Sequence, residues 1–589
     1  MTRSSNHNKL KKIGLFFVAT AVALSTDLFA AQIFQVTDFG AIPDDGQNDQ
    51  KAIQLALNEL SKTPGATLQF APGTYHLDSS IAAEKDTATL LLRGGGDVVV
   101  DGTGAQMIIR NQRVGFLLIR ECDGLTVRGF TIDFDPVPFA LGRVTGVFPG
   151  EGSFVMETLS GYPRPDNAVF SGGKAWGYFI DPAVPGKLAD GQNNVVFRES
   201  MTCVGGDLFR VQLGKDSGKL IRNLKPGTLA TQLAREGQLF LAGDSSNLVF
   251  ENITSYASAS GHYVGSNVEN IRVENCQALI KPGRYKGGNA DGVHLQNVRG
   301  PIVVRGCTFE GISDDCVNLY QKPHYLLERR SSTEWRLSSL AEKYVPRTAA
   351  GTLRSGDTLQ AYDSVTGVSF GRAKIKTFDP ATGWAKLESG WNVPESSSGW
   401  KEIRIYADGF GSDFVIENNI FKDSRRYGIF LKGHRGVISG NRFIRLSSSA
   451  IYASNETGHE EGGFCGDVRI ENNVIEDCGF ESNFFSNEAL GMITFQALKK
   501  PFVPVELKDL HRNITVSGNA IRGCPRGLMI NCVAGLKIED NSFEAMAAGR
   551  ISGTFPAELK ACTDVVEQRN NFIRPAELNS VVNSGTVDK

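Results

Sequence analysis

The chain lacks a bias towards either sign of charge. Its 589 residues contain 62 Lys and Arg against 64 Asp and Glu, which gives a formal net charge of −2. Proteins that bind nucleic acid usually carry a basic bias or a basic patch. We therefore expect no nucleic-acid partner for this chain.

Metal-binding patterns are also missing from the sequence. The eight His residues are dispersed, no CxxC pair occurs, and no run has the form of an EF-hand loop. These absences predict a protein without a metal site and without a cofactor.

The ten Cys residues form no dense framework of the kind that disulfide-rich domains carry. Several follow an expected strand at similar points, as Cys276 and Cys307 do. This recurrence favours free thiols stacked in a protein interior over disulfides.

The apolar run near the N-terminus is too short for a comfortable membrane span. Ile13–Leu24 falls below the roughly 20 residues that a span needs. Basic residues precede it at Lys9–Lys12, and small residues follow in Leu28–Ala31. This order is typical of a signal peptide, which we place at residues 1–31, and it predicts export to the periplasm or the medium. A buried N-terminal helix is the alternative.

What the sequence does contain is a repeat. Segments of the form apolar-x-apolar-x-x-Asn-x-apolar recur, and the same spacing separates Asn419 from Asn441 and Asn519 from Asn541. Alternating apolar residues predict strands, and this period predicts the stacked coils of a parallel β-solenoid. An Asn at a repeated turn can also bond to its stacked copy.

The residues before the first coils predict a capped end. Val36–Ala41 leads towards Lys51–Leu60, in which Ile53, Leu57 and Leu60 share one face of a helix. An open solenoid end exposes unpaired strands and apolar core, so a cap is needed. This opening resembles the entry of the pectin-lyase-like right-handed β-helices, in which a short helix covers the open end.

The coil pattern fails in two places, across about residues 140–245 and 321–410. Both segments keep short alternating runs and Gly turns, and Gly142–Phe148 in the first resembles Gly371–Phe378 in the second. We interpret them as two small inserted β-barrel-like domains. The second leaves the solenoid directly after an acidic strand, so we expect it to wall the acidic residues and to turn a groove into a pocket. A role in dimerisation is an equally open alternative.

These features together predict an all-β chain, a right-handed parallel β-helix with two small inserted β-barrel-like domains. The expected division is a signal peptide (1–31), a cap with the first coils (32–139), an inserted β domain (140–245), coils with the catalytic acids (246–320), a second inserted β domain (321–410), C-terminal coils (411–575) and a tail (576–589).

Two similar pentapeptides carry the acidic residues. Asp291 heads Asp-Gly-Val-His-Leu, Asp315 heads Asp-Cys-Val-Asn-Leu about one coil later, and Asp314 precedes the second. Stacked rungs lie about 4.8 Å apart. This spacing places Asp291 nearly under Asp315, with Asp314 beside both.

Three carboxylates at that range resist joint ionisation, so at least one pKa is expected to rise. A protonated carboxyl can act as a general acid while ionised neighbours activate water, and glycoside hydrolysis needs this combination. The alternative is that the acids are ordinary turn residues, because Asp is common in turns. The recurrence favours Asp291, Asp314 and Asp315 as catalytic residues; no substrate-binding residue can be assigned.

The acidic motifs resemble those of the polygalacturonases, which are inverting β-helix glycosidases. That family has Asn-Thr-Asp-Gly and, one coil later, Asp-Asp-Cys; this chain has Asn289–Gly292 and Asp314–Cys316 at those places. The resemblance implies that Asp314 is the general acid and that Asp291 and Asp315 hold and deprotonate the water. The family's later Gly-His-Gly and uronate-binding Arg-x-Lys motifs are not clean here.

Over the whole mature chain the sequence is more similar to family 110 of the glycoside hydrolases, the α-1,3-galactosidases. The similarity covers the Thr37–Ala41 entry, Asp133–Phe139, the spacing of the three acids and both insertions. It implies removal of terminal α-1,3-linked galactose with inversion, from blood-group B or linear Gal-α-1,3-Gal glycans. An enzyme that acts on a neutral sugar is expected to lack a uronate-binding motif, as this chain does.

Other functions stay open. Arg425, Arg426 and Lys432 keep a polygalacturonase-like hydrolase of α-linked galacturonate as an alternative. A β-helix polysaccharide lyase is another, although such lyases usually use a metal or a basic residue to abstract the proton. A non-enzymatic carbohydrate-binding solenoid would need no acidic trio.

Placement supplies a reason of its own for the predicted roles. Asp291 and Asp315 head equivalent strands and can grip one water, whereas Asp314 is offset and can approach the glycosidic oxygen from another direction. An inverting enzyme usually separates its acid and base by roughly 6.5–9.5 Å, which we also expect here. The inserted barrels beside a pocket, together with the family resemblance, favour a homodimer.

Overall fold

The structure is a computed structural model that describes residues 32–573, except 79–80, 84–85, 171–175, 215–216, 347–350, 396–398, 483, 485–489 and 546–556. The expected signal peptide at 1–31 and the tail at 576–589 lie outside these described residues. No helix in the described part of the chain is long and apolar enough to cross a membrane.

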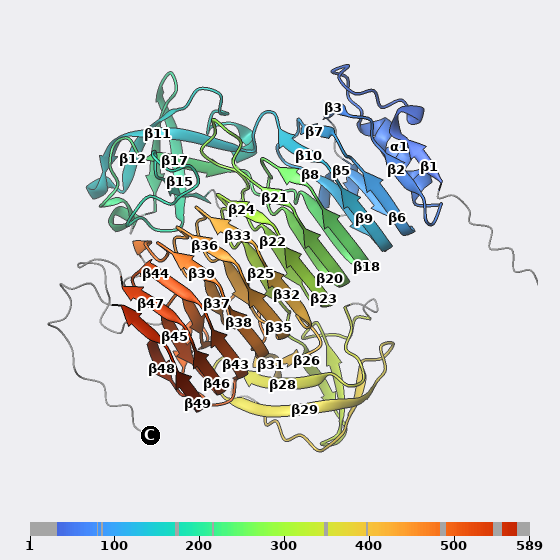
Figure 1. Cartoon of the computed structure of the whole chain (residues 1–589), viewed down its shortest axis with the longest axis vertical. Helices are drawn as coiled ribbons and strands as arrows, with labels where there is room; N and C mark the ends of the chain where they lie inside the picture. The colour runs from blue at the N-terminus through green and yellow to red at the C-terminus, as the bar shows by residue number, and fades with distance from the viewer. Residues whose placement is uncertain are drawn as a thin grey trace, which may run out of the picture.

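The chain winds into stacked coils whose strands form three long faces (Figure 1). One face is a 12-stranded parallel sheet. Its strands are β3 (Gly73–Leu77), β7 (Ala105–Ile109), β10 (Thr131–Phe134), β19 (Thr254–Ser255), β21 (Gln277–Ala278), β24 (Thr308–Glu310), β33 (Ile420–Lys422), β36 (Arg442–Ile444), β39 (Val474–Glu476), β44 (Ala520–Cys524), β47 (Ser542–Ala545) and β50 (Asn571–Ile573).

The other two faces join in one 23-stranded sheet, because β18 (Phe240–Glu251) and β20 (Tyr263–Glu274) continue from one face into the other. The second face contains β1 (Ile33–Gln35), β2 (Thr67–Gln69), β6 (Gly96–Asp101), β9 (Asp123–Arg128), β23 (Arg299–Arg305), β32 (Phe414–Glu417), β35 (His434–Ser439), β38 (Gly466–Glu471), β43 (His511–Ser517), β46 (Val533–Glu539) and β49 (Thr563–Gln568).

The third face carries the acidic residues. It contains β4 (Ile81–Ala83), β5 (Asp86–Arg93), β8 (Gly115–Arg120), β22 (Val293–Gln296), β25 (Val317–Tyr320), β34 (Ile429–Leu431), β37 (Ile451–Ala453), β40 (Ile493–Phe495), β45 (Leu528–Asn531) and β48 (Ala557–Lys560). All its pairings are parallel except that of β4 with β5.

The interior between the faces is one continuous apolar core. Strand side chains alternate between inside and outside, as in β38, where Val468 and Ile470 are buried whereas Asp467 and Arg469 are exposed. Equivalent positions stack from coil to coil, and the rings of Phe309, Phe421 and Phe443 lie 5.5 and 4.9 Å apart in succession. This burial of apolar side chains holds each coil on the next.

The predicted helix at the N-terminal end is confirmed. It is α1 (Gln50–Leu60), which follows the short helix η1 (Val36–Phe39), and Ile53, Leu57 and Leu60 are buried on one face. This face packs into the core at the blue end of the solenoid in Figure 1. The helix therefore covers strands that would otherwise be open to solvent.

The first insertion is a closed antiparallel barrel. Its strand order is β13 (Trp176–Gly177), β15 (Val196–Gly205), β16 (Leu208–Leu213), β12 (Ser153–Thr158), β11 (Phe139–Phe148), β17 (Leu229–Leu233) and β14 (Phe179–Ile180). The barrel closes because β13 and β14 are consecutive in the chain and pair with opposite ends of the sheet. The short helices η2 (Pro149–Glu151), η3 (Ala168–Phe170) and η4 (Ser217–Ile221) lie in its connections.

The second insertion is a barrel of six strands. Their order is β26 (Tyr325–Arg329), β27 (Glu334–Ser338), β30 (Trp384–Leu387), β29 (Ser369–Phe378), β28 (Thr358–Asp363) and β31 (Ile403–Ala407), with η5 (Trp400–Glu402) before the last. A bridge between His324 and Ile405 brings its two edge strands together. A separate hairpin, β41 (Ala497–Lys499) with β42 (Val503–Val505), branches from a later coil.

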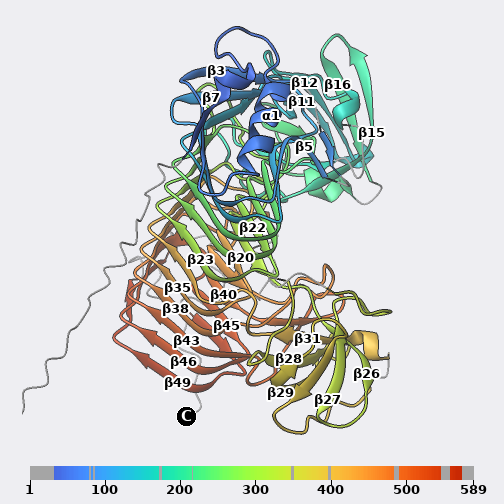
Figure 2. The same cartoon turned by 90° about the vertical axis from the view of Figure 1, so that its right-hand side faces the viewer.

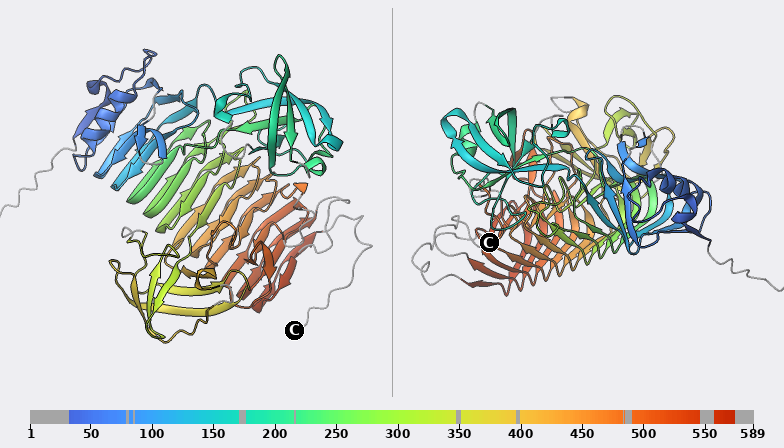
Figure 3. Two further views of the ribbon diagram at one scale, coloured as in Figure 1. Left: turned by 180° about the vertical axis from the view of Figure 1, so that it is seen from behind. Right: turned by 90° about the horizontal axis from the view of Figure 1, so that it is seen from above.

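Both barrels stand on the same side of the β-helix (Figures 2 and 3). The predicted all-β architecture, a parallel β-helix with two inserted barrels, is confirmed. The division of the chain into domains stays a prediction; β18 already returns to the coils at Phe240. All ten Cys are free, and eight of them are buried, as the scattered pattern predicted.

Candidate active site

The register of the third face brings the acidic residues together. Val293 on β22 pairs with Val317 on β25, and Leu295 pairs with Leu319. Asp291 and Asp315 each stand two residues before those paired valines, so they lie at equivalent points of neighbouring coils. The predicted stacking of Asp291 under Asp315 is therefore confirmed.

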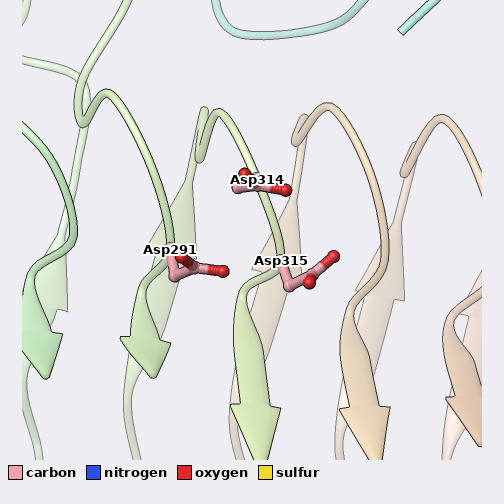
Figure 4. A group of neighbouring side chains, drawn as sticks. All are labelled: Asp291, Asp314 and Asp315. Carbon is pink, nitrogen blue, oxygen red and sulfur yellow. The ribbon is translucent and has the colours of Figure 1, made fainter. Parts of the chain in front are cut away.

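Asp314 is offset from this pair. Figure 4 shows Asp291 and Asp315 where two neighbouring strands begin, and Asp314 further back on the turn. One carboxylate oxygen from each of the three residues lies within 4.8 Å of the others. All three side chains are buried, with 7%, 7% and 1% of Asp291, Asp314 and Asp315 exposed.

Three arginines surround the Asp314 carboxylate. Arg235 Nη2 lies 2.5 Å from Oδ2, and Arg425 Nη2 and Arg426 Nη1 each lie 3.1 Å from Oδ1. Burial opposes ionisation of Asp314, but the arginine neighbours outweigh it and hold the pKa of this carboxyl well below its ordinary value. Asp314 is therefore ionised in the free protein.

Asp315 has the opposite environment. Its Oδ1 atom is buried without a hydrogen-bond partner, and its nearest cation is Arg426, whose Nε lies 3.6 Å away. Burial raises the pKa of Asp315 well above its ordinary value, and the neighbouring carboxylates of Asp314 and Asp291 add to this rise. The cluster thus contains one carboxyl whose pKa is raised, as expected for three crowded acids.

Asp291 contacts a histidine that the same pentapeptide supplies. His294 Nδ1 lies 3.3 Å from Asp291 Oδ2, and His294 Nε2 lies 3.0 Å from the Tyr320 hydroxyl. Burial favours the neutral imidazole, but the Asp291 carboxylate outweighs it and raises the pKa of His294. His294 and Tyr320 therefore fix the orientation of Asp291.

The acids lie at a cavity of about 540 Å³, here called the acidic cavity. Its lining comes from the coils, from the first barrel and from the loop 456–461. These residues are Asn194, Val195, Phe197, Arg235, Asp291, His294, Asp314, Asp315, Asn318, Arg425, Arg426, Tyr427, Glu456, His459 and Glu461.

From the sequence we expected the second insertion to wall the acidic residues, and this prediction is wrong. Among the described residues, none of those that line the cavity lies between 321 and 410. Asp315 precedes β25, whereas the second insertion leaves after its end at Tyr320, so the two lie at opposite ends of a strand. The second barrel instead supports the 456–461 loop from behind, through Tyr325 and Arg404, which both contact Glu460.

The first barrel reaches the cavity because of where its chain rejoins the coils. Phe240, where β18 begins, is in register with Tyr263, which is in register with Val293. Arg235 comes just before β18, at the edge of the third face where Asp291 and Asp315 also lie. The sequence offered no signal for Arg235, because its role depends on this register.

Three basic residues in or behind the cavity wall are paired with protein groups. Arg425 binds Asp314, and Arg426 binds both Asp314 and Glu456, the latter at 3.0 Å. Lys432 donates a hydrogen bond of 3.1 Å to Asn318 Oδ1 and lies 3.4 Å from Glu461. The cations that kept a uronate substrate open in the sequence therefore have acidic or amide partners inside the protein.

Glu456, His459 and Glu461 were missed by the sequence analysis. They lie in the acidic run after Asn455, which carries no repeat signal. His459 Nδ1 lies 2.8 Å from Glu456 Oε2, and this pair lines the cavity beside Arg426. A surplus of acids after a strand was the one available hint.

A divalent cation would fit the three aspartates by distance alone, because their oxygens lie within 4.8 Å of one another. However, both oxygens of Asp314 already face guanidinium groups, and three such groups repel a cation. The residues therefore suit acid and base chemistry better than metal binding. The absence of a metal stays a prediction.

Two families match parts of the chain. The family described as "Right handed beta helix region" matches residues 405–571, and the family described as "Rhamnogalacturonase A/epimerase, pectate lyase-like" matches residues 33–97. Their matches lie in the C-terminal coils and in the capped entry, respectively.

Curated relatives cover most of the chain. "Alpha-1,3-galactosidase A" of Shewanella woodyi is 22% identical over 94% of this chain and 93% of its own length. "Alpha-1,3-galactosidase B" of Phocaeicola vulgatus is 24% identical over 77% of this chain and 80% of its own length. Among solved structures, a family 28 exopolygalacturonase of Yersinia enterocolitica aligns with a TM-score of 0.41 at 13% identity, covering 91% of this chain and 78% of that one.

The resemblance predicted from the sequence, to the α-1,3-galactosidases and to the pectin-lyase-like β-helix superfamily, is confirmed, and the chain is a glycoside hydrolase built on a right-handed parallel β-helix.

Proposed function

We propose that this protein is an exo-acting hydrolase that releases terminal α-1,3-linked galactose with inversion. The observation that carries the proposal is the acidic cluster at a cavity, in which burial raises the pKa of Asp315 while the arginines around Asp314 lower the pKa of that carboxyl. Such a set can protonate a leaving oxygen and activate a water. The names of the curated relatives supply the sugar and the linkage.

The shape of the site supports action at a chain end. The first barrel and the 456–461 loop contribute lining residues to a cavity of about 540 Å³ over the coils, whereas a polymer interior needs a groove that is open at both ends. A terminal sugar and the start of the next sugar suit this volume.

The charges of the site support a neutral sugar. A uronate needs a cation that is available for its carboxylate, but Arg425, Arg426 and Lys432 are engaged by protein groups. The galacturonate alternative therefore loses the residues that supported it. A lyase loses support for a related reason, because the groups nearest the cluster centre are carboxylates rather than a free base.

We propose that Asp291 and Asp315 hold the attacking water and that Asp314 protonates the glycosidic oxygen. Two oxygens up to 4.8 Å apart can share one water, since two hydrogen bonds of about 2.8 Å span up to about 5.6 Å. The offset of Asp314 lets it approach from a second direction (Figure 4).

The pKa shifts in the free protein favour a different proton donor. The arginines outweigh burial and lower the pKa of Asp314, whereas burial raises the pKa of Asp315. For Asp314 to act as the acid, the bound sugar must displace arginine contacts, and Arg235 is the most exposed of the three arginines around this carboxylate. The competing assignment is that Asp315 donates the proton, and the variants below separate the two.

The spacing of the acids departs from expectation. Their nearest oxygens lie within 4.8 Å of one another, below the roughly 6.5–9.5 Å between carboxyl groups that is usual in inverting enzymes. A water held by the stacked pair, with the leaving oxygen on the other side of the sugar, keeps inversion compatible with this short range. The anomer that is released first decides the point.

The test uses Gal-α-1,3-Gal and α-galactosyl fluoride, whose leaving group needs no proton. Inversion predicts β-galactose as the first product by NMR. We expect Asp314→Asn to lose most activity on the disaccharide, at least a hundredfold, and much less on the fluoride. Asp291→Asn and Asp315→Asn should lose activity on both substrates, because water attack is still required.

Other outcomes are equally informative. Release of the α-anomer first would show retention and overturn the proposed mechanism. If Asp315→Asn is the variant that keeps activity on the fluoride, the acid is Asp315, and kcat/KM of the wild type should fall as the pH rises through its raised pKa. Release of galacturonate from polygalacturonate, without galactose from the disaccharide, would refute the neutral-sugar proposal.

We further propose that the protein is exported through the segment 1–31. Cell fractionation with antibody detection should find the shortened chain outside the cytoplasm, and an uncleaved cytoplasmic chain would contradict the proposal.

A further inference from the structure

One half-exposed aromatic ring stands at the acidic cavity. Phe197 is 49% exposed and lines the cavity, and among the described lining residues only Tyr427 has another ring of that kind. Phe197 lies on β15 of the first barrel. Strand alternation explains its direction, because Val196 is buried in the barrel core whereas Val195 and Phe197 face the cavity.

The chain that leads into β15 is anchored to the catalytic coils. Arg425, which binds Asp314 through Nη2, donates from Nη1 to the backbone oxygen of Asn194 at 2.7 Å. Ser482 Oγ also donates to Asn193 Oδ1 at 2.6 Å. These contacts fix the start of the strand beside the acids, and with it the position of the Phe197 ring.

The distance along the strand sets which sugar the ring can meet. Asn194 is tied to the arginine of the acid cluster, so it marks the depth of the reacting bond. Phe197 lies three residues further along the chain and therefore at most about 10 Å away, which is the reach of three extended residues. A ring near this limit would stand beside the sugar that follows the terminal one.

We propose that Phe197 is a specificity-determining platform on which the sugar next to the terminal galactose stacks. This inference rests on the proposed function. An aromatic face binds the apolar C–H face of a sugar ring. Removing water from a half-exposed aromatic ring costs little free energy when a sugar covers it. The platform selects glycans with a ring at this position over galactosides with small leaving groups.

The test compares Phe197→Ala with the wild type on Gal-α-1,3-Gal and on α-galactosyl fluoride. The fluoride has no second sugar. We expect kcat/KM on the disaccharide to fall about tenfold, mainly through KM, and kcat/KM on the fluoride to stay within twofold. Phe197→Trp should restore the activity on the disaccharide.

A matched control is Phe148→Ala on the same barrel. Phe148 is 38% exposed, lies under Arg210 at 4.7 Å and is not among the residues that line the cavity. This control should leave both substrates unchanged. It separates a sugar platform from a general effect of removing an exposed ring from the barrel.

Three results would overturn the inference. Disaccharide activity within twofold of the wild type would show that no sugar stacks on the ring. Equal losses on both substrates would place Phe197 at the terminal galactose or give it a structural role. After either of these two results the proposed function still stands, provided that the wild type is active on both substrates. A wild type that is inactive on both would refute the proposed function and this inference together.

Discussion

At the scale of single residues, two neighbours in the sequence have opposite environments. Asp314 faces three guanidinium groups, whereas Asp315 is 1% exposed and has an oxygen without a hydrogen-bond partner. The first carboxyl is therefore stabilised as an anion and the second as a neutral acid. Their places on the coil explain the contrast, because Asp315 lies just before β25 whereas Asp314 lies further back on the turn (Figure 4).

This contrast predicts opposite effects on stability. Asp314→Asn should lower the free energy of unfolding at pH 7 by roughly 3 kcal/mol, because it leaves buried guanidinium charge without its partner. Asp315→Asn should raise it by about 1 kcal/mol or more, because the amide cannot ionise and each unit of pKa shift is worth about 1.4 kcal/mol. Urea denaturation of both variants measures these differences.

The two carboxyls should also affect the pH dependence of stability in opposite ways. The pKa of Asp315 is raised in the folded state, so its cost is absent below the unfolded value of about 4 and grows as the pH rises towards the folded value. The pKa of Asp314 is lowered, so its stabilisation is present above about 4 and is lost as the pH falls. The gain of Asp315→Asn should accordingly vanish below pH 4, and a gain that persists there would refute this explanation.

At the scale of the element, the repeated turns hold a continuous line of asparagines, the Asn ladder. The side-chain amides of Asn419, Asn441, Asn473, Asn519 and Asn541 each donate to the next Asn along the solenoid at 2.9–3.0 Å, and Asn570 is the last acceptor. Each also donates to a backbone oxygen of an earlier coil, as Asn473 does to Ile438. The predicted bonding of stacked Asn copies is confirmed.

The turn before each ladder position needs a left-handed backbone. The preceding residues are Asn418, Gly440, Asn472, Gly518, Asp540 and Arg569, with φ between 54° and 65°. Asn, Asp and Gly tolerate this conformation best. The local sequence therefore sets both the bend and the amide that follows it.

The ladder predicts a graded loss of stability along the solenoid. Asn473→Ala should lower the free energy of unfolding by roughly 2–4 kcal/mol, because it is fully buried and leaves several polar groups of two neighbouring coils unpaired. Asn570→Ala is the matched control at the end of the described ladder. Its half-buried site lets water replace lost partners, so we expect a smaller loss in chemical denaturation.

Equal losses at the two positions would show that burial does not set the strength of the ladder. A loss below about 0.5 kcal/mol at Asn473 would show that apolar stacking alone holds the coils together.

At the scale of the whole molecule, both barrels project from one side of the β-helix (Figure 3). They leave large apolar side chains exposed, among them Val204 on the first and Val368 on the second. Two copies can bury such surfaces through one self-complementary contact, as homodimers do. The homodimer expected from the sequence therefore stays a prediction.

Light scattering and sedimentation across a range of concentrations test this prediction. We expect the mass of two chains at micromolar concentration, and the mass of one chain throughout the range would contradict it. Val204→Asp together with Val368→Asp should shift the equilibrium towards the monomer if the barrels form the contact, with hydrolysis of small substrates unchanged.

The architecture could be predicted from the sequence because the same local sequence pattern recurs in each coil. Alternating apolar residues set the strands, Asn and Gly set the bends, and the repeat sets the stacking. The cap, the two insertions and the stacking of Asp291 with Asp315 follow from these local patterns. The same patterns carried the resemblance to the α-1,3-galactosidases.

The surroundings of the acids were decided only by the tertiary structure. Arg235 is 79 residues from Asp314 in the chain and reaches it because β18 shares the register of β22 and β25. Phe197 and Glu456 come to the cavity from a barrel and from a loop whose placement no repeat encodes. A periodic pattern specifies what stacks on its own copy, but a pKa depends on every charge and every buried surface within a few ångströms, whatever its distance along the chain.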